Sequence, residues 1–462
     1  MAKAELQKKI ITVNKDNIGK SLEKIEDSNS SMQESLKALT VVGGYKMIES
    51  SIEGSQNLNP ERKARKNIFL SDSSKKAERQ KLKNTLEIWA SVLSSSEDID
   101  EMMSMSLGSA EQAEKTFSKN IGKALKESLD LERAYRSVAF FFKNAEQDKI
   151  KNFAVMNAEL EQLKDLDNPQ FIDAVKEEFV SSYDRLDLRD NYGLLIIPGY
   201  LGSNKVVEKW AKIAHENKVM MVTDFEHFDA PDDVLEMFDS ANLSGGDAYK
   251  SNVIMTCNWL VGRAKEEQVG EEEDLYVPPS GALAGTMYKT LMSQVAAGKK
   301  HGSLSEVDGV KFPLKKSEIA HLEKIGLVPM VNEYGKVMAY SAKTLFNGDN
   351  LGLQTYSVVR VFDYVTKVLM DFLNRRAFEN FNMKTKRDIQ SQIIRFLDSI
   401  TGPGKLIESF SIKRFEQDPK QKDRVFIDIS MKPYFPAKNF LLKLDGQKGD
   451  DGTEWDTDYE QK

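Results

Sequence analysis

The chain has 462 residues, of which 40% are hydrophobic and 30% are charged, a composition typical of a globular protein with two or three domains. Its 65 basic and 72 acidic residues give a net charge of −7, which argues against a dedicated nucleic-acid-binding protein. A single cysteine excludes an internal disulfide, and no apolar run reaches the ~18 residues of a membrane helix. The N-terminus lacks the apolar core of a secretory signal, so we expect a cytoplasmic protein without membrane insertion.

The first 80 residues are polar, rich in serine and biased towards helix. Ile18, Leu22 and Ile25 recur at helical spacing and form one narrow apolar stripe. Between residues 61 and 83, nine basic residues stand against three acidic ones. Such a segment buries little area alone, so residues 1–80 are predicted to form a helical arm that binds another molecule. A solvated, frayed tail is the alternative.

Wider apolar faces at helical spacing follow the arm. They comprise Leu82, Leu86, Trp89 and Leu93, then Phe117, Ile121 and Leu125, and then Leu131, Tyr135, Val138 and Phe142. The width of these faces predicts helices that face a core.

Short apolar runs then alternate with helical patterns. The runs at 193–198, 219–223 and 252–257 predict buried strands, and residues 206–214 and 231–238 predict helices between and after them. This alternation predicts an α/β middle region with parallel strands over residues 81–350. Six carboxylates within residues 266–274 indicate a solvated loop.

The region 351–445 is predicted to be an α+β domain. Residues 358–372 have the pattern of an amphipathic helix, and a second helix is expected to begin at Thr385, with Asp388 completing a capping box. Three strands should follow it. Their apolar residues are Phe410 and Ile412; Val425, Ile427, Ile429 and Met431; and Phe440, Leu442 and Leu444. Residues 446–462 are acidic and predicted to be a disordered tail.

The cluster Asp224, Glu226, His227 and Asp229 follows the predicted strand 219–223, where open α/β sheets bind ligands. Three carboxylates and an imidazole could hold a divalent metal. Side chains two apart on an extended chain share a face, so His227 should point away from Asp224 and Glu226. We therefore favour a polar surface loop, with Asp229 as the N-cap of the next helix.

Other motifs give weak signals for chemistry. The loop Gly199–Gly202 could cradle a phosphate, but it lacks the further residues of a dinucleotide fingerprint or a P-loop. Cys257 ends an apolar run and is interpreted as a core thiol. Gly281 and Gly285 form a G-x-x-x-G pattern outside any membrane segment, to which we give little weight. We therefore assign no catalytic, cofactor-binding or metal-binding residue.

Several segments, in order along the chain, resemble the large sheath subunit of the type VI secretion system, the TssC/VipB family. The segment 312–329 resembles the family's acid-led helix before "lGfipL", and 354–378 matches its "sRfAHYlKvi" helix in pattern. Residues 431–435 resemble the closing "LRPHF", and 132–142 the "lEatWRgLhyLv" helix. The segment Phe378–Phe381 replaces the family's "RDkiG", which indicates a divergent branch.

The resemblance implies a non-enzymatic structural subunit with a tail-sheath-like core and no cofactor. Such a subunit pairs with a small sheath subunit, polymerises helically around an inner tube on a baseplate, and contracts to propel that tube. An AAA+ unfoldase then disassembles the contracted sheath. Two alternatives remain: the sheath of a phage-like or extracellular contractile particle, and a metal- or nucleotide-dependent α/β enzyme.

The resemblance also suggests roles for two sets of residues. The C-terminal strands are expected to join a sheet completed by neighbouring protomers. The strand-sharing residues are Val425, Ile427, Ile429, Met431, Phe440, Leu442 and Leu444. The stripe of Ile18, Leu22 and Ile25 is expected to be the segment that the unfoldase recognises.

Overall fold

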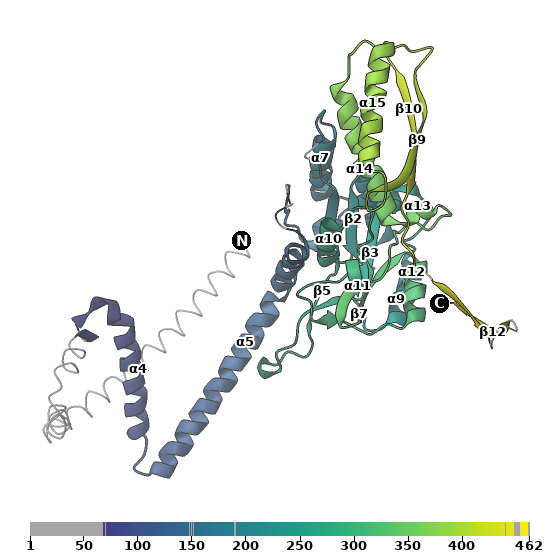
Figure 1. Ribbon diagram of the computed structural model, residues 1–462. Coiled ribbons are helices and arrows are strands. Elements are labelled where there is room, and N and C mark those ends of the chain that lie inside the picture. The colour runs from purple at the N-terminus through teal and green to yellow at the C-terminus, as the bar shows by residue number, and fades with distance from the viewer. Residues whose placement is uncertain are drawn as a thin grey trace. The chain divides into compact units, whose positions relative to one another are not determined.

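The computed structural model describes residues 68–69, 71–146, 148, 150, 152–188, 191–438, 440–447 and 453–460 (Figure 1). The chain divides into two compact units, Met1–Asn120 and Ile121–Lys462. The predicted unfoldase-recognition residues Ile18, Leu22 and Ile25 lie outside the described residues. Within the described ranges, no helix has both the length and the apolar character needed to cross a membrane.

The described part of the first unit is helical. The short 3-10 helix η1 (Ser73–Lys75) leads into α4 (Lys76–Leu93), and the 46-residue helix α5 (Ile99–Asn144) begins in this unit and ends in the second. Helices α4 and α5 contain the residues whose apolar spacing predicted helices, from Leu82 to Phe142.

The expectation that the apolar faces of α4 and α5 are directed at a core is wrong for much of their length. Leu82 and Leu93 of α4 are exposed, and so are Leu131 and Tyr135 of α5, at 73% and 71%. The side chains that α5 does bury are Ser137, Phe140, Phe141 and Asn144. Periodicity identifies a helix and its apolar face, but it does not show what covers that face.

The second unit contains the predicted α/β sheet, a five-stranded sheet of order β1-β2-β3-β7-β8. The pairs β1–β2, β2–β3 and β3–β7 are parallel, whereas β7–β8 is antiparallel. The prediction of parallel strands is confirmed. The strands are β1 (Leu194–Ile197), β2 (Met220–Asp224), β3 (Val253–Cys257), β7 (Leu327–Glu333) and β8 (Lys336–Ala339).

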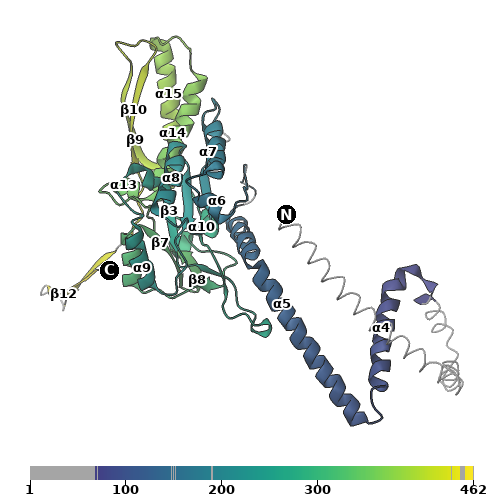
Figure 2. The ribbon, with the colours of Figure 1, turned by 180° about the vertical axis from the view of Figure 1, so that it is seen from behind.

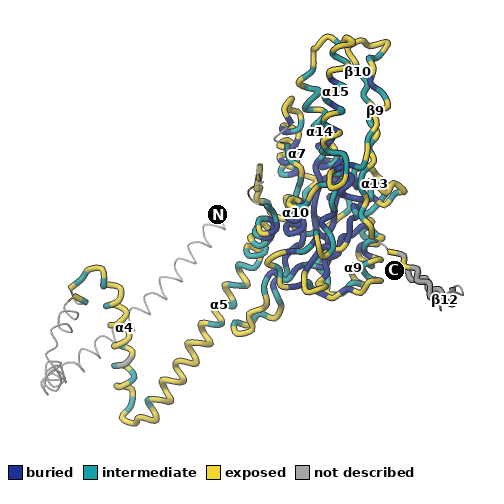
Figure 3. The backbone as a smooth tube through the Cα atoms, in the orientation of Figure 1, coloured by how far each residue is buried: buried dark blue, intermediate teal, exposed yellow. Residues whose placement is uncertain are grey.

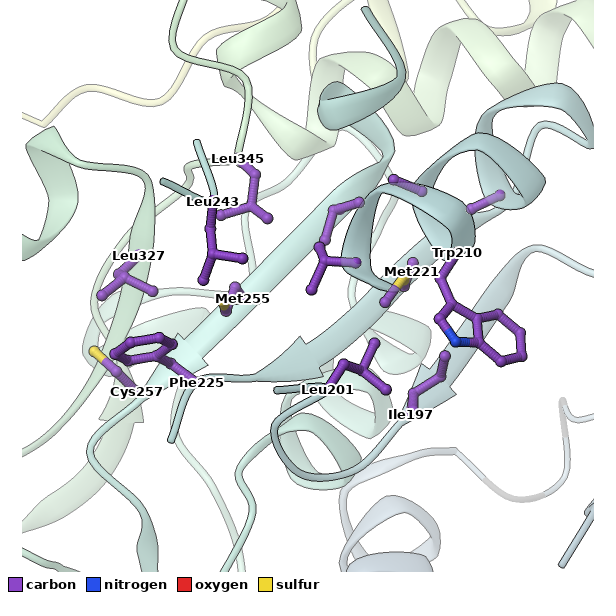
Figure 4. Packing of buried hydrophobic residues seen from close by; sticks show 14 of the residues in the cluster. Ile197, Leu201, Trp210, Met221, Phe225, Leu243, Met255, Cys257, Leu327 and Leu345 are labelled. Atoms are coloured by element: carbon purple, nitrogen blue, oxygen red, sulfur yellow. The ribbon is translucent and has the colours of Figure 1, made fainter. Parts of the chain in front are cut away.

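Apolar side chains are buried on both faces of this sheet. Met221 and Met255 belong to one core cluster, which also contains Trp210 (Figure 4). Met220 and Ile254 belong to the other, which includes Phe141 of α5. Successive residues of a strand point to opposite faces, and helices cover both, so β2 and β3 read as continuous apolar runs.

The remaining elements of the central part surround this sheet. A smaller sheet has the order β5-β4-β6, with β4 (Leu260–Arg263), β5 (Leu275–Val277) and β6 (Gly309–Val310). The helices are α6 (Leu160–Lys164), α7 (Gln170–Tyr183), α8 (Asn204–Glu216), α9 (Pro231–Ala241), η3 (Ala248–Asn252), η4 (Glu267–Val269), α10 (Ser280–Lys289), α11 (Gly298–His301), α12 (Lys316–Lys324) and α13 (Leu351–Gln354).

The G-x-x-x-G pattern, which we expected to have little meaning, lies where α10 meets the backbone of α5. A Cβ added at Gly281 would lie 2.2 Å from the carbonyl oxygen of Ser137. One added at Gly285 would lie 2.4 Å from the carbonyl oxygen of Phe141. Both distances are far shorter than van der Waals contact, so the two glycines permit a close approach of helices that any larger residue would prevent.

The C-terminal part consists of two helices and two hairpins (Figure 2). Helix α14 (Tyr356–Arg375) confirms the predicted amphipathic helix. Helix α15 (Met383–Ser399) begins two residues before the expected start, because Asn382 caps it by accepting hydrogen bonds from the amides of Lys384 and Thr385. The hairpins are β9 (Ile407–Gln417) with β10 (Val425–Pro433), and β11 (Leu441–Gln447) with β12 (Thr453–Glu460).

Within the predicted disordered tail 446–462, residues 453–460 form strand β12, and the prediction is corrected for these residues. The high density of acidic residues suggested disorder, but these residues alternate with β-favouring ones. The alternating residues are Thr453, Trp455, Thr457 and Tyr459. Pairing with β11 then supplies the backbone hydrogen bonds of a hairpin.

Candidate functional site: the C-terminal strands

Asp224, which the sequence placed in a surface loop, is fully buried at the end of β2. Its carboxylate accepts hydrogen bonds from the amide of Gly199 at 2.8 Å and from the amide and hydroxyl of Ser280 at 2.7 and 2.6 Å. Thr256 of β3 also donates its hydroxyl to it. Burial raises the pKa of Asp224 to about 6, against the opposing effect of these hydrogen bonds.

The prediction was wrong because the cover over Asp224 comes from a distant part of the chain. Ser280, at the start of α10, lies 56 residues later in sequence. Asp224 therefore joins the loop after β1, the strand β3 and the helix α10. It is a structural group whose bonding capacity is used within the chain.

The other members of the cluster point elsewhere. Glu226 is exposed, and Asp229 forms an ion pair with Lys311 at 2.9 Å. The N-cap position of α9 is held by Ala230, not by Asp229 as expected, and Ala230 makes no side-chain capping bond; Pro231 follows in the first turn. The structure thus separates the carboxylates that the sequence grouped. Within the described part of the chain, no three His, Cys, Asp or Glu residues are grouped to hold a metal ion.

His227 lies between the rings of Trp259 and Tyr276, with centroid distances of 5.0 and 4.8 Å. Burial lowers the pKa of His227 to about 4, and the nearby charge of Lys311 adds to this effect. The imidazole is therefore neutral at pH 7 and contributes to an aromatic cluster.

The glycine loop and the cysteine have structural roles. Gly199 has a φ of 93° and Gly202 a φ of 81°, values that favour glycine and explain both positions. The Gly199 amide, which could have bound a phosphate, donates to Asp224 instead. Cys257 is fully buried, and burial raises the pKa of its thiol, so it is held as a neutral core residue.

The hairpin β9–β10 contains four of the predicted strand-sharing residues. Val425, Ile427, Ile429 and Met431 alternate along β10 and pack, partly buried, against a cluster formed with α14 and α15. In the antiparallel register, Ile427 lies opposite Phe415 and Ile429 opposite Ile412. The predicted apolar face is therefore present, and it is directed at helices of the same chain.

The opposite face of this hairpin is mainly polar, with Phe426 under the guanidinium of Arg414 as an exception. Asp428, Ser430 and Lys432 are exposed along β10. Lys432 forms an ion pair with Glu408 at 2.5 Å across the two strands. A polar, solvated face and a covered apolar face leave the strand edges as the part of the hairpin that can add another strand.

Both hairpins have unpaired edges within the described residues. Strands β9 and β10 form a two-stranded sheet, and apart from a bridge between Thr401 and Ile407 they pair only with each other. Strands β11 and β12 form a second two-stranded sheet. A two-stranded sheet is marginally stable in water, and its free N–H and C=O groups are a template for strands of another chain.

The remaining predicted residues lie at or near the second hairpin. Phe440, just before β11, and Leu442 are 64% and 51% exposed, and Leu444 lies within β11. The sequence treated β11 as the strand next to β10, whereas the structure pairs it with β12. The signal for β12 was present in the alternation of residues 453–459.

Comparison with known proteins identifies the family of this chain. Family models match residues 32–121, 123–347 and 355–461, described respectively as the TssC/VipB-like N-terminal region, the type VI secretion system TssC/VipB central domain and the TssC/VipB-like C-terminal domain. Together they span almost the whole chain. A search of curated protein sequences found no significant match.

Solved structures of contractile particles are similar over part of the chain. The contracted helical sheath of the anti-feeding prophage has 18% identity, covers 68% of this chain and 82% of its own, and gives a TM-score of 0.47. The contracted sheath of the PVC extracellular contractile injection system has 14% identity, coverages of 53% and 68%, and a TM-score of 0.42. A sheath tail protein from Listeria innocua has 11% identity, coverages of 58% and 56%, and a TM-score of 0.37.

The family matches include the C-terminal hairpins that the structure leaves with free edges. The chain belongs to the TssC/VipB family and is a structural subunit of a contractile type VI secretion sheath, not an enzyme.

Proposed function

We propose that this chain is the large subunit of a cytoplasmic type VI sheath, and that strands from neighbouring protomers complete the sheets of its C-terminal hairpins. The observation that supports this most is the pair of two-stranded sheets with free edges within the described residues, in a chain whose central strands β2 and β3 are fully buried. Added strands gain affinity from main-chain hydrogen bonds, and alternating side chains set the register. The strand-sharing residues are those predicted on β10 and around β11.

This role implies specific partners for the chain. A small sheath subunit pairs with this chain, and the helical polymer of such pairs surrounds an inner tube and starts on a baseplate. An AAA+ unfoldase recognises the stripe of Ile18, Leu22 and Ile25 in the N-terminal arm and recycles the contracted sheath. The sheath of an extracellular contractile particle is the second candidate. A neighbouring gene for a small partner of about 20 kDa would exclude it.

The strand-sharing proposal is tested on Ile427, which is the third residue of β10 and lies opposite Phe415. Proline removes a backbone donor and is tolerated in sheets only at edges and bulges. We expect Ile427→Pro, co-expressed with the small subunit, to give no tubes in negative-stain electron microscopy. The soluble heterodimer should persist, because the arm and the central sheet are unchanged.

Ile427→Val is the matched control. It loses one methyl group, at roughly 0.5–1.5 kcal/mol of packing, and should still polymerise. Tubes of normal length from the proline variant would show that β10 does not carry the lattice.

Two further expectations concern the single chain and its arm. Without the small subunit the chain should be poorly soluble, and a monodisperse, well-folded monomer in size-exclusion chromatography would count against the proposal.

Replacing Ile18, Leu22 and Ile25 together by Asp should permit sheath extension but leave contracted sheaths undissolved in cells. Normal sheath turnover in that variant would overturn the assignment of the arm.

A further inference from the structure

One face of α14 carries polar side chains that bond to the central part of the chain. They recur at spacings of three and four residues, so they form a single stripe along the helix. We call this stripe the polar seam. It consists of Arg360, Asp363, Lys367, Asp371 and Asn374.

The first half of the polar seam contacts α10 and η3. Arg360 donates a hydrogen bond to the carbonyl of Met287 in α10 at 3.2 Å. Asp363 accepts one from the side-chain amide of Asn252 in η3 at 2.7 Å. The same amide also donates to the carbonyl of Val219, just before β2, at 3.1 Å. Asp363 is therefore bonded to a group that is itself fixed to the central sheet.

The second half of the polar seam contacts the connection between α7 and β1. Backbone groups of this connection bond to the seam in reverse order, so the connection runs antiparallel to α14. The pairs are Lys367 with the carbonyl of Tyr192 at 2.7 Å, Asp371 with the amide of Leu188 at 3.0 Å, and Asn374 with the carbonyl of Leu186 at 3.3 Å.

Another face of α14 is apolar and packs on the C-terminal elements. Val365 is buried in one cluster with Ile393 of α15 and Phe415 of β9. Apolar packing is non-directional, whereas hydrogen bonds require a narrow range of distances and angles. Helix α14 therefore carries α15 and the hairpin β9–β10 on one face, and the polar seam bonds it to the central part on the other.

The charged groups in the middle of the seam make its register specific. Burial lowers the pKa of Lys367 to about 8 and raises the pKa of Asp363. A charge held away from water costs free energy unless it is hydrogen-bonded. A shift of α14 by one turn, ~5.4 Å, would separate both side chains from their partners, although apolar contacts could form again.

We infer that Asp363 and Lys367 are positioning residues, which set the register of α14 and so hold the edges of β9 and β10 in a fixed place on the central part. Buried polar groups act in this way where they select one arrangement among several apolar alternatives. In a sheath, strands of neighbouring protomers must meet those edges in the same register at every subunit. This role rests on the sheath assembly proposed above, but it acts within one chain.

Pulsed electron paramagnetic resonance on the soluble heterodimer measures the position of the C-terminal elements directly. Spin labels are attached at Asp233→Cys in α9 and Ser391→Cys in α15, two exposed positions, while the native Cys257 is buried. The test variant combines Asp363→Leu with Lys367→Met. We expect one narrow distance distribution for the wild type, and for the variant a distribution broadened or displaced by up to ~5.4 Å, one helical turn.

The double variant should still fold, because apolar groups of similar volume can replace buried charged groups. Near-UV circular dichroism checks this. Lys367→Met alone leaves Asp363 bonded to Asn252, and it serves as a milder variant with a smaller broadening. In tube assembly with the small subunit, we expect the double variant to require a roughly tenfold higher protein concentration.

Two variants serve as matched controls. Thr366→Ala changes an exposed residue of the same helix, whose hydroxyl donates to the carbonyl of Phe362 within α14 at 2.8 Å. Asp363→Asn keeps an oxygen that accepts the hydrogen bond of Asn252. Both should give the wild-type distance distribution and assemble as the wild type does.

A folded double variant with the wild-type distance distribution would overturn the positioning role. Normal tube assembly by a variant with displaced distances would overturn its link to assembly. A wild-type chain that forms no tubes with its small subunit would instead contradict the proposed function, and the distances in the heterodimer would still decide the role of the polar seam.

Discussion

The central sheet and the C-terminal hairpins use the same kind of strand in opposite ways. Every residue of β2 and β3 is buried, and even Asp224 has its hydrogen bonds satisfied within the chain. In β10 no residue is fully buried, and the hairpin has free edges within the described residues. Figure 3 shows this difference as a mainly dark-blue centre and a teal-and-yellow β10. The centre therefore provides stability of the fold, whereas the free edges of the hairpins are the part that the proposed function assigns to assembly.

The largest effect on the central region should come from Asp224→Ala. The substitution leaves the buried donors of Gly199, Thr256 and Ser280 without their acceptor, so we expect a loss of about 3 kcal/mol or more in the free energy of unfolding. Chemical denaturation of the heterodimer measures it. The exposed Glu226→Ala should change stability by no more than about 0.5 kcal/mol.

The same reasoning applies to replacing Asp224, Glu226 and His227 together by Ala. Read as surface residues, they should leave assembly intact. With Asp224 buried, we expect the triple variant to be destabilised mainly through that residue. Equal stabilities of Asp224→Ala and Glu226→Ala would contradict the role of the buried carboxylate.

A smaller effect is expected where α10 meets α5. Gly281→Ala places a methyl group against the carbonyl of Ser137, so the helices must separate, at a cost of about 1–3 kcal/mol. Thermal melts of the heterodimer measure this loss. Gly108→Ala is the matched control, because nothing lies within 4 Å of a Cβ at that position of α5. It should be neutral or stabilise the helix by up to about 1 kcal/mol, and a destabilisation equal to that of Gly281→Ala would contradict the close-contact explanation.

The smallest effect concerns pH. Because burial raises the pKa of Asp224 to about 6, the folded state binds a proton more readily than the unfolded state. Its contribution to stability is therefore present at low pH and lost as pH rises through 6, about 1 kcal/mol between pH 5 and 7. His227 has the opposite effect on stability. Because its pKa is lowered to about 4, the folded state binds a proton less readily than the unfolded state, so the His227 contribution to stability is lost as the pH falls below the usual histidine pKa.

Comparing wild type with Asp224→Asn at both pH values removes the contribution of His227, which both proteins share. The wild type should gain relative to Asp224→Asn on acidification. An identical change in unfolding free energy for the two proteins would show that Asp224 does not titrate in this range.

Local patterns predicted much of the fold because they report local structure. The apolar runs that became β1, β2 and β3 and the amphipathic pattern of α14 were read directly from residue spacing. The family resemblance then supplied the sheath role, which the chain's own spacing could not give.

The errors arose where distant segments meet. The burial of Asp224 depends on Ser280, and the role of Gly281 depends on the backbone of Ser137. Neither partner is visible in the local sequence. The strand β12 was missed for another reason: the count of acidic residues outweighed the alternation of Trp455 and Tyr459 with them.

Hydrogen–deuterium exchange tests the contrast between the two regions most directly. Backbone amides of the heterodimer are compared before and after tube assembly with the small subunit. We predict that amides of β9, β10 and β11 gain strong protection on assembly, because neighbouring strands pair with their free edges, while β2 and β3 are protected equally in both states. Unchanged exchange in the hairpins of intact tubes would contradict the account.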